Sequence, residues 1–295
     1  STNLGECHTN YDRKKINMDF FLYSISTWLI LFLIGLPIAV IILPKGLREQ
    51  SLVIALLFGY GYVTFISYYV FRSNVGGTDT YAWFLVAPPL LLLAVYASSL
   101  FTRTLNLVEL FNKDALLALA CTTVAWIALS WLHFDLGSPA LALAISNLDV
   151  VELAVESRYL QEFPRDTQIG FMGQTGWLKY VGDVIWFGPS LIVAFISTLL
   201  NTEPYKLQTL VMNIISAQGA GILFLFARQL PGVNRSLALA LALLYAVSPV
   251  IVYTAWQSFG AQMISIPIIL AILYLHTYVI NSAPDWSRSI STLAS

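Results

Sequence analysis

The chain has 295 residues, of which 58% are hydrophobic and only 11% are charged. A soluble domain carries about a quarter charged residues, so much of this surface must face something other than water. The net charge of −1 supplies no basic patch of the kind that binds nucleic acid, which excludes nucleic acid as a partner. The sequence contains no zinc-ligand spacing, Walker A loop or HExxH motif, so we predict no metal site and no cofactor.

Apolar runs follow one another along the whole chain, and each is long enough or nearly long enough to cross a bilayer. A crossing needs about 20 apolar residues, and backbone in lipid must be helical because no water satisfies its polar groups. The runs are 20–43, 51–71, 81–101, 115–132, 184–200, 207–227, 236–253 and 261–280. The predicted fold class is therefore all-α: a polytopic transmembrane helix bundle of about seven spans, multi-pass in the cell membrane, with membrane lipids as its surroundings.

Two of these runs contain helix-breaking residues. Pro88 and Pro89 predict a kink in the third run that packs against neighbouring helices. The fifth run, 184–200, is short and contains Gly188-Pro189. If this run does not span and the N-terminus lies outside, short inside loops carry seven Lys and Arg residues and outside segments carry four. If it spans, that contrast disappears, so we predict a surface or re-entrant helix there.

This topology divides the chain into three predicted regions. Residues 1–132 form an N-terminal four-helix membrane region, and residues 207–295 form a C-terminal three-helix membrane region. Between them, residues 133–206 form a long external acidic loop with amphipathic and surface helices. Loops of this length are uncommon unless they are functional, so the loop is where we expect the chemistry.

Within the loop, residues 146–163 are predicted to form a helix that stops before Pro164. At about 100° per residue, Asp149, Glu152 and Glu156 fall within a sector of roughly 60° on this helix. A cation, a substrate or the helix N-terminus should offset their mutual repulsion. The alternative reading is helix capping and solvation, because Ser146 precedes Asp149 by three residues and acids favour a first turn.

Two arginines accompany the acids of the predicted helix. Arg158 and Arg165 could hold a phosphate at the membrane surface, since guanidinium groups match phosphate oxygens geometrically. The alternative is that both are solvated or contact lipid headgroups. The sequence alone leaves both interpretations open.

From Ile145 onward the chain resembles the GT-C polytopic glycosyltransferases, which use polyprenyl-phosphate-linked sugars. Asn147-Leu148-Asp149 stands where those proteins carry an acid early in the first large external loop. Phe187-Gly188-Pro189-Ser190-Leu191 resembles their Pro/Gly-containing segment before a surface helix. The segments 213–232 and 238–249, with the latter's terminal Ser-Pro, resemble the next two spans. The resemblance covers about half the chain.

The resemblance implies roles for the loop residues. Asp149 would be the catalytic base that deprotonates an acceptor hydroxyl, with inversion at the anomeric carbon. Arg158 or Arg165 would stabilise the departing phosphate, and Glu152 and Glu156 would bind substrate. The implied partner is a polyprenyl-phosphate-linked sugar.

A rival prediction is a non-catalytic accessory subunit of a larger membrane complex, with the acidic loop as a docking surface for protein partners. Val150-Val151-Glu152 follows the acid where family members often carry an aromatic residue. Only about three spans follow the loop, fewer than is normal in the family. A secondary transporter is disfavoured because the predicted spans lack Asp, Glu, Lys and Arg.

Overall fold

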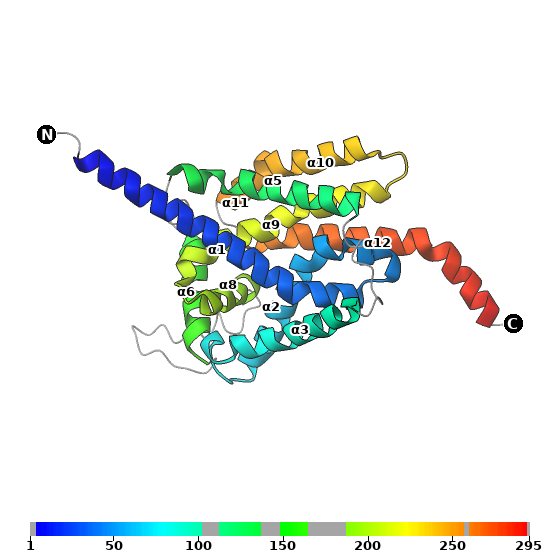
Figure 1. Ribbon diagram of the computed structural model, residues 1–295, viewed down its shortest axis with the longest axis horizontal. Coiled ribbons are helices and arrows are strands. Elements are labelled where there is room, and N and C mark those ends of the chain that lie inside the picture. The colour runs from blue at the N-terminus through cyan, green and yellow to red at the C-terminus, as the bar shows by residue number, and fades with distance from the viewer. Residues whose placement is uncertain (1–3, 102–111, 137–147, 165–186, 257–259, 294–295) are drawn as a thin grey trace.

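The computed structural model describes residues 4–101, 112–136, 148–164, 187–256 and 260–293, and these residues are helical apart from short turns (Figure 1). The predicted all-α class is confirmed. The helices are α1 (Leu4–Ile42), the 3-10 helix η1 (Lys45–Gln50), α2 (Ser51–Arg72), α3 (Thr78–Phe101), α5 (Lys113–Leu136), α6 (Leu148–Glu162), α8 (Phe187–Leu200), α9 (Pro204–Gln229), α10 (Arg235–Val247), α11 (Pro249–Trp256) and α12 (Gly260–Leu293).

Six of the described helices are long and apolar enough to cross a membrane: α1, α2, α3, α5, α9 and α12. The pair α10 and α11 makes a seventh span if it is counted as one helix bent by 43°. The bend falls at Ser248-Pro249, where the proline ring disfavours helical backbone in the preceding residue. The protein is therefore a multi-pass integral membrane protein, and the prediction of about seven spans is confirmed.

The prolines of the third span do not break it. α3 runs from Thr78 to Phe101 as one helix with Pro88 and Pro89 inside it. Pro89 is buried, whereas Pro88 is exposed. Because the helix continues through both residues, no broken transporter-like helix is present in α3.

α9 is the central helix of the bundle and is buried along most of its length. Two of its buried amide side chains donate hydrogen bonds to neighbouring helices, which compensates in part for their removal from water. Asn213 Nδ2 donates to the Leu129 carbonyl oxygen of α5 at 3.3 Å, and Gln218 Nε2 donates to the Val53 carbonyl of α2. These contacts set the positions of α5 and α2 against α9.

Ion pairs identify which helix ends lie together. Asp114 at the start of α5 contacts Arg228 at the end of α9 at 3.4 Å and Arg235 at the start of α10 at 2.6 Å. We call this the Arg228 end of the bundle. At the other end of α9, Glu203 contacts Arg158 of α6 at 2.8 Å, and we call this the α6 end. Figure 1 shows α6 and α8 together at that end.

α8 does not cross the bundle. α5 leaves the Arg228 end and α9 returns to it, so the chain between them starts and finishes at the α6 end. With 14 residues, α8 is about 21 Å long, shorter than a hydrocarbon core of about 30 Å. The non-spanning prediction is therefore supported by the fold.

The position of α8 differs from that of a helix lying on the outer surface. The run 190–197 is buried without interruption. The Cβ that a side chain would add at Gly188 lies 3.0 Å from the hydroxyl of Tyr60, well inside α2, whereas Thr198 bonds Asp79 in the first turn of α3. α8 thus runs from inside the bundle, at Gly188, to the α6 end, at Thr198, without crossing the bundle, which favours the re-entrant alternative over a surface helix.

Candidate functional site

The acidic helix predicted at 146–163 is α6, Leu148–Glu162. It stops before Pro164, and the Tyr159 hydroxyl donates to the Pro164 carbonyl oxygen at 3.0 Å. Asp149 lies in the first turn of α6, where the helix dipole favours a carboxylate, and Glu152 lies in the next turn. Both precede Leu153, where the described side chains of this helix begin. Arg165 lies outside the described residues.

α6 is held at its end of the bundle by apolar packing. Tyr159 and Leu160 form a buried cluster with Leu191 and Ala194 of α8 and Phe71 of α2. Burial of a leucine-sized side chain contributes about 1.5–3 kcal/mol, so this cluster fixes α6 against α8. Asp149 and Glu152 therefore belong to a helix whose later turns are packed against α8 and α2.

Glu156 turns into the bundle. Its residue surface is only 5% exposed, and Ser190 Oγ donates to its Oε2 at 2.5 Å. The solvated alternative does not hold for this acid. Burial of a carboxylate is costly unless hydrogen bonds compensate for the lost water, so the contact with Ser190 ties the third acid of the stripe to α8.

We predict that Ser190→Ala lowers the stability of the bundle by about 1–3 kcal/mol, because it removes a hydrogen bond to a buried carboxylate. Thermal unfolding of the purified protein, followed by tryptophan fluorescence, measures the loss. Ser197→Ala is the matched control: Ser197 is an equally buried serine of α8 whose hydroxyl has no hydrogen-bond partner among the described residues. Equal unfolding midpoints for the two variants would contradict the predicted role of Ser190.

Arg158 is engaged by two carboxylates. It pairs with Glu162 one turn further along α6 and with Glu203 ahead of α9, and its side chain is 44% exposed. Exposed ion pairs contribute at most about 1 kcal/mol each. Their effect is mainly to place the guanidinium between α6 and α9.

A second polar contact near α6 could not be predicted from the sequence. Thr198 Oγ1 donates to Asp79 Oδ1 at 2.7 Å and lies 2.8 Å from Thr78 Oγ1. Asp79 is recognisable as an acid in the first turn of a span, but no spacing relates it to Thr198 or relates Glu156 to Ser190. These pairs are separated by 119 and 34 residues, and only the fold brings them together.

No group of three or more His, Cys, Asp or Glu side chains within the described ranges could hold a metal ion. The geometry defines a multi-pass helical membrane protein. Its short re-entrant helix α8 packs against the acidic helix α6 at one end of the bundle. No protein-family model, curated protein or solved structure matches the chain.

Proposed function

We propose that the protein is a GT-C-like membrane glycosyltransferase that transfers a sugar from a polyprenyl-phosphate donor at the external membrane face. The observation that supports this most directly is the position of α6. Its first turn contains Asp149, and the helix is anchored on re-entrant α8 at the end opposite Arg228 and Arg235. By the positive-inside rule, the arginine-rich end faces the cytoplasm, so Asp149 faces outward.

In the proposed reaction, the Asp149 carboxylate accepts the proton of an acceptor hydroxyl. The resulting oxygen attacks the anomeric carbon of the donor sugar, the bond from that carbon to the phosphate oxygen breaks, and polyprenyl phosphate leaves with the bonding electrons. Configuration at the anomeric carbon inverts. A general base of this kind contributes typically about 10²–10⁴-fold to the rate.

The remaining predicted residues divide between substrate and scaffold. Because Arg158 is already paired with two carboxylates, Arg165 is the stronger candidate for contact with the donor phosphate. Glu152 is proposed to bind the acceptor from the same face of α6 as Asp149. Glu156, which accepts a hydrogen bond from Ser190, is proposed to fix the orientation of α6 relative to α8.

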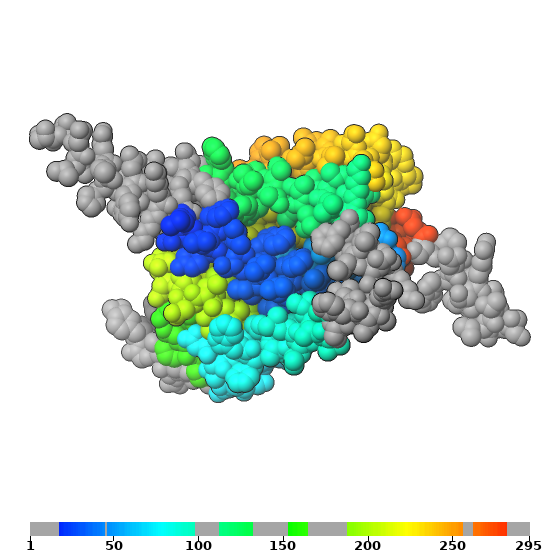
Figure 2. Space-filling model, viewed as in Figure 1, coloured from blue at the N-terminus to red at the C-terminus, as the bar shows by residue number. Residues whose placement is uncertain are grey.

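An apolar groove between α1 and α5 offers a place for the polyprenyl chain. These helices lie side by side on the face drawn in Figure 2. The groove is a cavity of about 360 Å³ lined by Trp28, Leu29 and Trp126, with Ile214 of α9 also in its wall. It reaches Ser24, next to Tyr23, whose hydroxyl accepts from Thr202 at 3.3 Å in the turn between α8 and α9. The groove thus leads toward the α6 end.

A transfer assay tests the proposal. The protein, purified from native membranes and placed in lipid nanodiscs, is incubated with polyprenyl-phosphate-linked mannose, glucose or arabinose and a panel of sugar acceptors. We expect release of polyprenyl phosphate, detected by mass spectrometry, together with a sugar-extended acceptor of inverted configuration. Empty nanodiscs and heat-treated protein provide the background.

The same preparation addresses the accessory-subunit alternative. Recovery of stoichiometric protein partners, without bound polyprenyl phosphate and without transfer by the assembled complex, would replace the enzyme proposal with that of a structural subunit. The first contact to examine would then be α6.

A further inference from the structure

One ridge of α9 leads from the apolar groove between α1 and α5 toward the α6 end. Ile214 lines the groove, and Leu210 and Lys206 precede it at intervals of four residues. Side chains spaced by four form a ridge along a helix, and Lys206 lies about 12 Å from Ile214 along the helix axis. Thr202, four residues before Lys206, bonds Tyr23 of α1. Lys206 therefore lies between the wall of the groove and a contact with α1.

Lys206 also lies at the level of the membrane interface. It is the third residue of α9, and the apolar span of this helix begins at Pro204. The residue is exposed, as expected for a lysine whose stem lies along apolar surface while its ammonium group reaches water. A lipid whose chain occupies the groove would therefore have its headgroup near this ammonium group.

No ion pair balances the charge of Lys206 within the described residues. Its Nζ lies 5.7 Å from the centroid of the Tyr205 ring, a contact that brings no negative charge. Glu203, three residues earlier, is bound to Arg158 at 2.8 Å. The positive charge at this end of the groove is therefore available to an anion.

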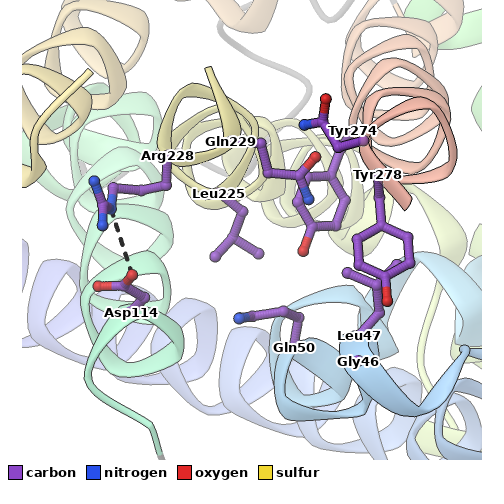
Figure 3. Close-up of a pocket in the computed structure, with 10 residues that line it drawn as sticks. Gly46, Leu47, Gln50, Asp114, Leu225, Arg228, Gln229, Tyr274 and Tyr278 are labelled. Atoms are coloured by element: carbon purple, nitrogen blue, oxygen red, sulfur yellow. Dashed lines mark hydrogen bonds and ion pairs between the residues drawn. The ribbon is translucent and has the colours of Figure 1, made fainter. Parts of the chain in front are cut away.

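Helix stability does not explain a cation at this position. The N-terminus of a helix has a partial positive charge, so a lysine in the first turn is disfavoured. The first turn of α9 contains no acid, and its N-cap residue makes no side-chain capping bond. At the other end of α9 the dipole favours a cation, and Arg228 there is paired with Asp114 beside a polar cavity of about 340 Å³ (Figure 3). The ammonium group and the uncapped N-terminus together favour a negatively charged ligand.

The start of α9 is also where this helix meets the acidic helix α6. Glu203 immediately precedes α9 and contacts Arg158 of α6, and Lys206 follows Glu203 by three residues. An anion bound by Lys206 would therefore lie on the side of the bundle that carries α6. This is the side on which the proposed sugar transfer takes place.

We propose that Lys206 binds the phosphate of a polyprenyl phosphate lipid whose single chain lies in the groove lined by Trp28 and Trp126. The choice of a polyprenyl chain rests on the proposed function. The place of the phosphate follows from the groove, the ridge of α9 and the unbalanced charge of Lys206. A phosphate has several acceptor oxygens, so this contact adds to the one proposed for Arg165.

The test is a titration of the purified protein in detergent with farnesyl phosphate, with bound lipid counted by native mass spectrometry. This probe has an isoprenoid chain and a phosphate but no sugar to transfer. We expect saturable binding of one lipid, which Lys206→Gln weakens by roughly fivefold. Lys113→Gln is the matched control and should leave binding unchanged. Lys113 is an exposed lysine at the start of α5, at the Arg228 end, and has no ion pair among the described residues.

A second variant, Thr123→Phe, tests the groove itself. Thr123 is exposed and lines the groove, so a phenylalanine there fills the space for the chain without replacing a buried side chain. We expect the saturable binding of farnesyl phosphate to be lost. Unchanged binding in Thr123→Phe or in Lys206→Gln would overturn the proposal, as would equal affinity for farnesol, which lacks the phosphate.

The binding site and the transferase activity can fail separately. A protein that binds farnesyl phosphate through Lys206 but transfers no sugar in nanodiscs retains this site and loses the transferase proposal. A protein that transfers sugar, while Lys206→Gln changes neither farnesyl phosphate binding nor the KM for the donor, retains the transferase proposal and loses this site.

Discussion

Replacing Asp149 with asparagine is expected to lower the rate of sugar transfer by roughly 10²- to 10⁴-fold, the contribution of a general base. Asparagine keeps the size and the first-turn position of the side chain but cannot accept the acceptor's proton. Initial rates of polyprenyl phosphate release, measured in nanodiscs at saturating donor, give the comparison. The loss should appear in kcat, because proton removal accompanies the chemical step.

Asp19→Asn is the matched control for this experiment. Asp19 is an exposed carboxylate in the N-terminal part of α1, and no ion pair is observed for it within the described residues. Its variant should transfer sugar at the wild-type rate. An Asp149→Asn protein that retains full activity would exclude Asp149 as the base, and the transferase proposal would then lack its central residue.

The second large effect concerns the contact between α1 and α2, where the two backbones meet at glycines. A Cβ at Gly59 would overlap the Leu31 carbonyl oxygen of α1, and one at Gly35 would overlap the Ala55 carbonyl oxygen of α2. Spans approach this closely only where small residues face each other. We expect Gly35→Ala and Gly59→Ala each to destabilise the bundle by about 1–3 kcal/mol, because the helices must separate.

Gly61→Ala separates this packing effect from helix propensity. Gly61 lies in the same helix as Gly59, but a Cβ there would meet nothing within 4 Å. Alanine favours a helix over glycine by up to about 1 kcal/mol, so Gly61→Ala should leave stability unchanged or raise it. Thermal unfolding midpoints in detergent provide the measurement. A Gly59→Ala protein as stable as Gly61→Ala would contradict the close approach of α1 and α2.

The identity of the spans follows directly from the sequence. Apolar runs of bilayer length leave the backbone no alternative to a helix, so α1, α2, α3, α5, α9 and α12 were predictable. The helix predicted at 146–163 was also recognisable, because Pro164 disfavours helical backbone in the residue before it. The charge imbalance between loops also indicated that the fifth run does not span. The three-region division of the chain and the functional roles of Asp149, Glu152, Glu156, Arg158 and Arg165 stay predictions.

What the tertiary structure alone decided is the environment of individual side chains. The stripe on α6 places Glu156 beside Asp149 and Glu152, yet periodicity cannot tell which helix covers that stripe. Docking of α6 on α8 buries Glu156 against Ser190. In the same way, Arg228 and Gln50 are distant in sequence, and only the meeting of α9 with η1 encloses both in one cavity. Local patterns fix helices because their hydrogen bonds are local, whereas sites depend on contacts between distant residues that form only when the helices pack.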